Sequence, residues 1–453
     1  MDERLGRSLE FRYSSVPVGF AFLSSGKYMR VTGAGLTCDA ETKDVVKMRK
    51  RRVTIFGVVV AVALTMLPIS VSGQPNGPGS EIRFATFNAS LNRNNAGDLA
   101  EELASPGSAQ PDVIAEIIQR VRPDVLLINE FDFDPDALAD FQANYLEVAH
   151  GSAGPIVYPY SYIAPSNTGI YSGFDLDNSG GAGDFLPNDS FGFGFFPGQF
   201  GMAVLSMYPI DFDGVRTFQN FLWKDMPGAL LPDDPATPEP ADWYSDEELE
   251  VFRLSSKSHW DVPIEIGGST VHFLVSHPTP PVFDGDEDRN GTRNFDEIRF
   301  WADYIHPARS GYIYDDDGNF GGLAAADLFV VAGDQNSDPL DGDSIPGAIQ
   351  QLLENPKVNT KMTPASLGAV EQSALQGGAN DDHLSDPAHD TADFADGAPG
   401  NLRADYVLPR KSMKITDSGV FWPESTDPLF SLVGTFPFPS SDHRLVWVDV
   451  RIK

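Results

Sequence analysis

The 453-residue chain contains a single cysteine, Cys38, close to its N-terminus. One thiol can form neither an intramolecular disulfide nor a metal site built from several thiolates. No cysteine follows Cys38, so the rest of the chain also lacks a cysteine nucleophile. The folded part must therefore be stabilised by packing or by bound cations, and not by covalent crosslinks.

Positively charged side chains are also scarce. The chain has 32 Lys and Arg against 65 Asp and Glu, a formal net charge of −33, and no basic run follows Arg52. Because clustered Lys and Arg are needed to neutralise phosphates, this composition argues against a large non-specific hold on nucleic acid or on an anionic membrane. A phosphate-bearing substrate would be held locally, by a metal ion or a few cations. Hydrophobic residues make up 41% of the chain, which excludes wholesale disorder.

Long hydrophobic runs are rare, and the one exception indicates export. A basic segment, MRKRR, starts at Met48 and is followed by an apolar run over residues 53–67 and then by small residues. This order predicts a signal peptide over residues 48–73 and a mature chain that begins near Gln74. A retained membrane anchor is the alternative, although the run is shorter than the ~20 residues of a spanning helix.

Residues 74–453 would form the exported protein, either extracellular or periplasmic. This part has a net charge of −38 and no cysteine, and we expect no stable membrane insertion after cleavage. Residues 1–47 resemble neither a domain nor a signal and are left unassigned; a true start at Met48 would account for them.

Short apolar runs rich in Val, Ile and Phe alternate with helical patterns along residues 74–453, without an internal repeat or a linker. This organisation predicts one elaborate α/β domain. The predicted strands are Ile82–Phe87, Val125–Ile128, Met202–Leu205, Val271–Val275, Leu328–Ala332, Tyr406–Leu408 and Leu445–Val450. The predicted helices are Asp112–Arg120, Asp136–Tyr145, Phe295–Ile305 and Ala348–Glu354. Gly- and Asp-rich stretches, such as residues 377–400, are interpreted as insertions at loop ends.

Polar side chains stand at the ends of five predicted strands, where a structural role does not require them. They are Asn88, Glu130, His277, Asp334 with Asn336, and Asp442 with His443. Each alone has a structural explanation, for example as a turn former or a helix cap. Together they bring hard oxygen ligands and two imidazoles to one rim of a sheet, the composition of a Mg²⁺ site with acid–base groups beside it. Asp405 opens another strand and is suited to orienting an imidazole.

The chain resembles the endonuclease/exonuclease/phosphatase superfamily through an ordered set of motifs, which are FN (Asn88), NE (Glu130), GMAVLSMYPI, SH (His277), GDQN (Asp334, Asn336), RADY (Asp405) and SDH (Asp442, His443). The resemblance spans about residues 80–453, and longer runs such as SSKSHWDVP are similar to a group of secreted bacterial members. It implies a four-layer α/β sandwich, with two mixed β-sheets packed face to face and helices outside. It also implies metal-dependent cleavage of a phosphoester by water.

For the metal, the resemblance implies that Glu130 ligates Mg²⁺ or Mn²⁺, with Asn88 and Asp442 beside it as ligands or support. Many relatives carry an arginine where this chain has Met207, so one cation is missing. The candidates that could contact phosphate in its place are Arg299, Lys257 and Arg403.

For catalysis, the resemblance implies that His443, oriented by Asp405, activates water or steadies the phosphorane. Asp334 and Asn336 would address the attacked phosphate or the leaving oxygen. His277 would contribute a hydrogen bond to the phosphoryl oxygens. Family members differ in which histidine is the base.

A second candidate metal site follows His277. The calcium-loop pattern D-x-[DN]-x-[DN]-G-x5-E is matched in full by Asp286, Asp288, Asn290, Gly291 and Glu297. The usual entering helix is missing from the preceding SHPTPPVFDG. A substrate-facing loop is therefore an equally good interpretation, and Ca²⁺ is an alternative.

The leading hypothesis from the sequence is an exported, divalent-metal-dependent phosphoester hydrolase that acts on a small or lipid-derived substrate. A secreted metal-dependent nuclease is the first alternative, because it uses the same chemistry. The alternative from another class is a non-catalytic, calcium-stabilised binding protein on the same scaffold. Retention of the complete set of polar strand-end residues argues against that last interpretation.

Overall fold

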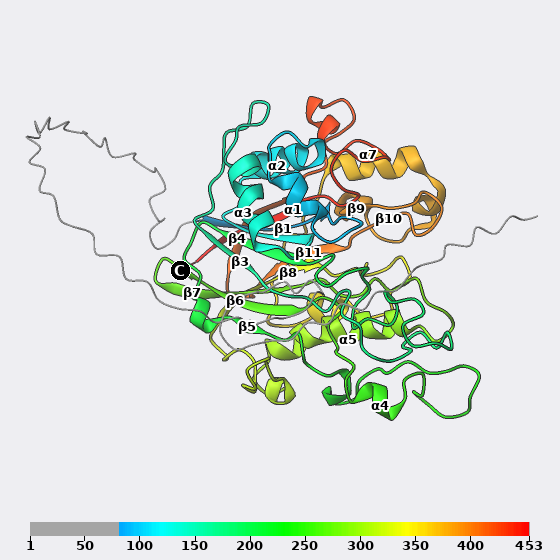
Figure 1. Ribbon diagram of the computed structural model, residues 1–453. Coiled ribbons are helices and arrows are strands. Elements are labelled where there is room, and N and C mark those ends of the chain that lie inside the picture. The colour runs from blue at the N-terminus through cyan, green and yellow to red at the C-terminus, as the bar shows by residue number, and fades with distance from the viewer. Residues whose placement is uncertain (1–80, 453) are drawn as a thin grey trace, which may run out of the picture. The chain divides into compact units, whose positions relative to one another are not determined.

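The computed structural model describes residues 81–452, which form two β-sheets with helices on both outer faces (Figure 1). Cys38 and the predicted signal peptide lie outside the described residues. None of the helices in the described part of the chain has both the length and the apolar character that a membrane span requires.

The first sheet has six strands in the order β12-β13-β1-β2-β4-β3. Its strands are β1 (Glu81–Leu91), β2 (Val125–Phe131), β3 (Tyr160–Ile163), β4 (Met202–Ser206), β12 (Lys414–Val420) and β13 (Val446–Arg451). Only β1 and β2 pair in parallel, and the other pairs are antiparallel.

The second sheet has five strands in the order β11-β8-β7-β6-β5. Its strands are β5 (Arg216–Thr217), β6 (His259–Ile266), β7 (Ser269–Ser276), β8 (Leu328–Asp334) and β11 (Asp405–Pro409). Again one pair, β7 with β8, is parallel and the rest are antiparallel. A short ribbon of β9 (Ala392–Asp393) and β10 (Asn401–Leu402) stands apart from both sheets.

The two sheets pack face to face through an apolar core. Phe84 of β1 meets Phe273 of β7 with ring centroids 5.6 Å apart, and Trp260 and Val262 of β6 belong to the same buried cluster. Alternate residues of a strand point to opposite faces. Leu274 and Val331 therefore lie in a second cluster on the outer face of the second sheet.

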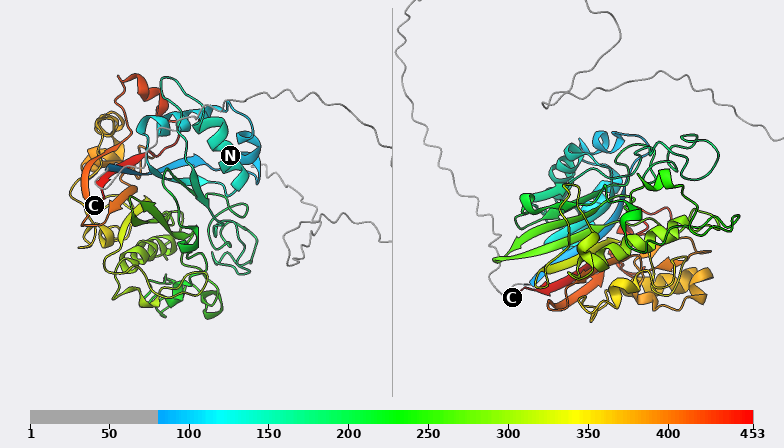
Figure 2. Two further views of the ribbon diagram at one scale, coloured as in Figure 1. Left: turned by 90° about the vertical axis from the view of Figure 1, so that its left-hand side faces the viewer. Right: turned by 90° about the horizontal axis from the view of Figure 1, so that it is seen from below.

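Helices cover both outer faces and complete four layers. Figure 1 shows α1, α2 and α3 on the first sheet, and Figure 2 shows α5 lying across the second. The helices are α1 (Asp98–Leu103), α2 (Ala109–Val121), α3 (Pro135–Phe141), α4 (Asp246–Leu249), α5 (Arg289–Tyr304), α6 (Gln350–Leu353) and α7 (Leu367–Gln376). The predicted sandwich of two mixed sheets with helices outside is confirmed.

Sequence patterns located the central strands and missed others. All seven predicted strands are present. The sequence analysis did not predict β6, which contains Pro263, or β12, whose KITDSGV sequence is rich in residues that disfavour strands. Helix α5 begins at Arg289, six residues before its predicted start.

Candidate active site

The strand topology brings the predicted polar residues to one edge of the sandwich. Because β1 and β2 run in parallel, Asn88 pairs with Asn129 and lies beside Glu130. The parallel strands β7 and β8 end at the same edge of the second sheet. The antiparallel β11 starts there, so that Asp405 pairs with Asp334.

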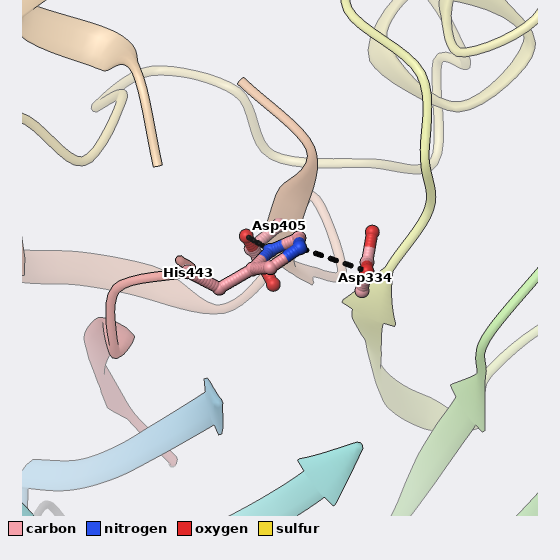
Figure 3. A group of neighbouring side chains, drawn as sticks. All are labelled: Asp334, Asp405 and His443. Atoms are coloured by element: carbon pink, nitrogen blue, oxygen red, sulfur yellow. Dashed lines mark hydrogen bonds and ion pairs between the residues drawn. The ribbon is translucent and has the colours of Figure 1, made fainter. Parts of the chain in front are cut away.

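A histidine and two aspartates form the centre of this site (Figure 3). His443 Nδ1 lies 2.8 Å from Asp405 Oδ2, and His443 Nε2 lies 3.6 Å from Asp334 Oδ2. Burial alone would lower the pKa of His443, but Asp405 and Asp334 outweigh it and raise that pKa well above its usual value. Because Nδ1 is held by Asp405, Nε2 is the nitrogen that faces Asp334.

Asp334 lies between the two imidazoles. Its Oδ2 is 3.4 Å from His277 Nε2 and accepts a hydrogen bond of 3.0 Å from the Asn88 amide. Burial, with the nearby charge of Asp405, raises the pKa of Asp334 to about 7. Burial and the charges of Lys257 and His443 lower the pKa of His277 well below its usual value. The pKa values of the two histidines are therefore shifted in opposite directions.

The geometry around Glu130 suits a divalent cation. Its two carboxylate oxygens accept hydrogen bonds from Asn88 (3.1 Å) and from Asn92 (2.7 Å). Burial, together with the charge of Asp442, raises the pKa of Glu130. Among residues 81–452, no Lys, Arg or His forms an ion pair with Glu130 or Asp442. Two hard carboxylates thus line one cavity without a direct ion pair to a protein cation, a donor set that fits Mg²⁺ or Mn²⁺.

Three further residues of the predicted set are placed as follows. Asn88 uses its amide group to bridge Glu130 and Asp334, which makes it a support for both. Asn336 has a positive φ of 50° and donates its side-chain amide to the Pro278 carbonyl. Asp442 lines the same cavity as Glu130 and His443.

That cavity has a volume of about 910 Å³ and opens over the site. The predicted residues on its wall are Glu130, Lys257, His277, Asn290, Asp334, Asn336, Asp442 and His443. Much of the remaining wall is apolar and includes Leu176, Phe193, Phe200, Phe252, Val282 and Phe394. The Phe394 ring meets His443 edge-on at 5.3 Å.

Sequence comparison supplies the family. The sequence matches the profile of the Endonuclease/Exonuclease/phosphatase family over residues 85–443. The chain belongs to this family. Members of the family are generally metal-dependent hydrolases of phosphoesters. The resemblance found in the sequence motifs is therefore confirmed.

Solved structures offer distant similarities only. One is the endonuclease/exonuclease/phosphatase from Beutenbergia cavernae, at 17% identity, with 82% of this chain and 72% of that chain covered and a TM-score of 0.43. Truncated Caenorhabditis elegans TDP2 has 15% identity, 83% and 99% coverage and a TM-score of 0.38. Sphingomyelinase C from Streptomyces griseocarneus has 15% identity, 82% and 99% coverage and a TM-score of 0.37. No curated protein matches the sequence.

Several residues that support the site through hydrogen bonds could not be identified from the sequence. Thr391 donates its hydroxyl to Asp405 Oδ2 (2.9 Å) and accepts hydrogen bonds from the amides of Ala404 and Asp405. The Arg444 guanidinium is buried and donates to the carbonyls of Ser441 and His443. These contacts fix the backbone on both sides of the catalytic pair.

The stretch of residues 377–400, interpreted from the sequence as an insertion at a loop end, contacts the site directly. Its segment Thr391–Asp393 is buried and forms a bridge with His443. Spacing and composition gave no sign of this, because the contact is made with residues about 50 positions later in the chain. Only Asn92 followed a recognisable pattern, that of a polar residue just after a strand.

Two of the three candidate phosphate contacts do not line the cavity. Arg299 lies on α5 and donates to the carbonyls of Pro227 and Gly228, away from the cavity wall. Arg403 stacks on the ring of Tyr406 and is also absent from the wall. Only Lys257 lines the cavity.

The calcium loop is wrong. Helix α5 starts at Arg289, the fourth position of the pattern, so Asn290 is already helical and no cation loop forms. Glu297 is fully buried, and its two oxygens accept hydrogen bonds from the amides of Ser256 (2.7 Å) and Thr279 (2.6 Å). Asp288 caps the helix in a left-handed conformation, and Asp286 is exposed. Glu297 therefore joins two active-site segments and is not free to bind calcium.

Another group of acids, Asp175, Asp177 and Asp189, places carboxylate oxygens within 4.8 Å of one another. Each of the three carboxylates already accepts hydrogen bonds from donors in its own loop. Their mutual arrangement is accounted for by these loop contacts.

Proposed function

We propose that the protein is an exported phosphoester hydrolase that depends on a divalent metal ion and acts on a small or lipid-derived substrate. The observation that supports this most strongly is the Asp405–His443 pair, whose Nε2 faces Asp334 on the wall of the cavity that also contains Glu130. A protein that only binds its ligand has no need of an oriented imidazole next to hard metal ligands.

Each protein group has a distinct task in this proposal. Asp405 holds the tautomer and orientation of His443, so that Nε2 exchanges a proton or a hydrogen bond with the reacting phosphoryl group or water. His277, neutral and buried, adds a second hydrogen-bonding nitrogen beside Asp334. A metal ion held by Glu130 and Asp442 would supply charge to stabilise the non-bridging oxygens. No covalent nucleophile is needed.

The side chains of the cavity wall favour a substrate that has few charges and a large apolar part. Aromatic and aliphatic side chains dominate it away from the catalytic groups. It contains three cationic side chains, Lys257, Arg289 and Arg293. Arg289 forms an ion pair with Glu287, and Arg293 donates hydrogen bonds to backbone carbonyls. A nucleic acid would need a track of cations for successive phosphates. A phosphodiester or monoester with one phosphate matches this wall better.

A phosphoester panel tests the proposal. The full chain is assayed with Mg²⁺, Mn²⁺ or Ca²⁺ on lysophospholipid-type and aryl phosphodiesters, on phosphomonoesters and on single- and double-stranded oligonucleotides. We expect metal-dependent release from the apolar esters at a higher kcat/KM than from oligonucleotides. Preference for oligonucleotides would establish the nuclease alternative, and turnover of none of them would refute a hydrolase.

Export is a separate part of the proposal. We propose cleavage near Gln74, so that residues 74–453 form the secreted enzyme and residues 48–73 are removed. The basic, apolar and small-residue segments around Met48 support it. N-terminal sequencing of protein from the culture medium or periplasm should begin close to Gln74. Recovery of the uncleaved chain in the membrane fraction would replace export by anchoring.

A further inference from the structure

We propose that Lys257 binds a phosphoryl oxygen of the substrate. The inference rests on the proposed function, because it names a ligand group for the same cavity. Lys257 precedes β6, and the pairing of His259 with Ser276 places it across from the segment that carries His277. Its side chain lines the cavity together with Glu130, Asp334 and His443.

Within the described residues, the ammonium group of Lys257 has no protein partner. The residue is only 7% exposed, and among residues 81–452 no hydrogen bond or ion pair to its side chain is found. Glu297 is the carboxylate with the largest effect on the pKa of Lys257. Both of its oxygens accept hydrogen bonds from the backbone amides of Ser256 and Thr279. On the cavity wall, the ammonium group is therefore available to an anionic ligand.

The two other cations on the wall are not available in this way. Arg289 forms an ion pair with Glu287 and lies over the ring of Trp243. The Arg293 guanidinium donates hydrogen bonds to the backbone carbonyls of Leu254, Phe191 and Arg253. Among the cations that line the cavity in the described part of the chain, Lys257 is the one whose charged group has neither an ion pair nor a hydrogen bond to the protein.

The charged form of Lys257 is favoured by nearby carboxylates, and the backbone around it is fixed by hydrogen bonds. Burial lowers the pKa of the ammonium, while Glu297, Glu130 and Asp334 favour the charged form. The backbone around it is fixed, since Asn167 donates its amide to the Lys257 carbonyl and Ser256 donates to Glu297. A fixed cation aimed at a developing oxyanion stabilises the transition state more than the ground state.

Three variants of the full chain test this inference. Lys257→Met removes the charge with little change of volume, Lys257→Arg keeps the charge, and Arg299→Met removes a paired cation away from the cavity wall. Binding of inorganic phosphate in the presence of Mg²⁺ is measured by calorimetry, alongside Mg²⁺ affinity, thermal unfolding and turnover of the best substrate of the panel.

We expect Lys257→Met to weaken phosphate binding at least tenfold and to lower kcat/KM by about 10²–10³-fold, the loss typical of one oxyanion donor. Lys257→Arg should recover most of the phosphate binding, and Arg299→Met should stay within about twofold of the wild type in both. Mg²⁺ affinity should be unchanged or tighter in Lys257→Met, because a nearby cation is lost.

The outcomes separate this inference from the proposed function. Phosphate binding that depends on Lys257 in a chain that hydrolyses no ester would support the inference while the hydrolase proposal fails. Normal phosphate binding and turnover in Lys257→Met would overturn the inference while the hydrolase stands. It is also overturned if the wild type does not bind phosphate, or if Lys257→Met loses Mg²⁺ affinity or thermal stability in parallel with turnover.

Discussion

The Nδ1 atom of His443 lies 2.8 Å from Oδ2 of Asp405 across the junction of the two sheets. Asp405 opens β11 in the second sheet, and His443 stands just before β13 in the first. A second bond between the sheets joins the Asp334 amide to the Asn129 side chain at 3.3 Å. The face-to-face packing of the sheets therefore sets the catalytic geometry directly.

The first prediction concerns this pair. Asp405→Asn should lower kcat at least 10²-fold with little change in Mg²⁺ affinity, because the imidazole loses its orienter while the metal ligands remain. His443→Ala should cost at least as much. The double variant should lose little more than the worse single variant, since the two residues act as a unit.

Steady-state kinetics and Mg²⁺ titration of the three variants check this. Losses that add on a logarithmic scale, or a loss confined to Mg²⁺ affinity, would show that the two residues work independently. His277 would then be the better candidate for proton transfer.

The second prediction concerns Glu130. Glu130→Gln should abolish metal-dependent turnover, because it removes a charged ligand at a strand end. Without metal, the variant should be at least as stable as the wild type, since the repulsion between Glu130 and Asp442 is relieved. At a Mg²⁺ concentration of 100 Kd the wild type should gain about 2.7 kcal/mol of stability, which the variant lacks.

Chemical denaturation with and without Mg²⁺ measures that difference, and Asp442→Asn provides a second variant with the same expected direction. Equal stabilisation of wild type and Glu130→Gln by Mg²⁺ would place the metal elsewhere in the chain.

The third prediction separates a structural Glu297 from a calcium ligand. Glu297→Gln should lower the free energy of unfolding by about 2–4 kcal/mol, because buried amides of Ser256 and Thr279 lose a charged acceptor. Asp286→Asn, at the exposed first position of the pattern, should leave stability unchanged. Denaturation curves with Ca²⁺ and with EGTA should shift equally in both variants and in the wild type. A Ca²⁺ response lost in both variants would restore the calcium loop.

The fourth prediction concerns the dependence of stability on pH. His272 Nδ1 lies 2.8 Å from Asp261 Oδ1, and Asp261 also accepts a hydrogen bond from Tyr304. Burial opposes the charge on His272, but Asp261, with a smaller effect from Asp327, raises its pKa despite the nearby Arg216. The pair therefore stabilises the fold fully below the unfolded pKa of about 6.5, and this contribution disappears as the pH rises through the folded pKa.

His272→Gln should accordingly lower Tm more at pH 5.5 than at pH 8.5. His389→Gln is the control, because its ring nitrogen faces the carbonyl of Pro364 and not a carboxylate. A difference between wild type and His272→Gln that is constant across this range would show that the ion pair contributes nothing that titrates.

The fifth prediction concerns Thr391, which the sequence did not single out. Thr391→Val should reduce kcat by about tenfold or more and leave Mg²⁺ affinity intact, because Asp405 loses a donor and two backbone amides lose an acceptor. Thr391→Ser, which keeps the hydroxyl, should restore most of kcat. Equal loss in both variants would point to packing of the methyl group instead.

The sequence by itself determined the core strands and the residues that end them. Apolar runs such as Val125–Ile128 mark buried strands, since few other segments can lose that much surface to water. The polar residue after each run stands out because burial without a task is costly, and Asn88, Glu130 and Asp334 were found in this way. The order of these residues along the chain was then enough to indicate the family.

Tertiary structure alone decided which candidates share the site. Lys257, Arg299 and Arg403 are indistinguishable as cations in the sequence, and only folding placed Lys257 on the cavity wall. Glu297 satisfied every position of a calcium pattern, but α5 starts too early for the loop to exist. Thr391 contacts Asp405 from a segment whose sequence shows neither helical nor strand periodicity. The local sequence pattern indicates which functional side chains a chain contains. The distances between these side chains depend on how one sheet packs against the other, and this packing involves the whole chain.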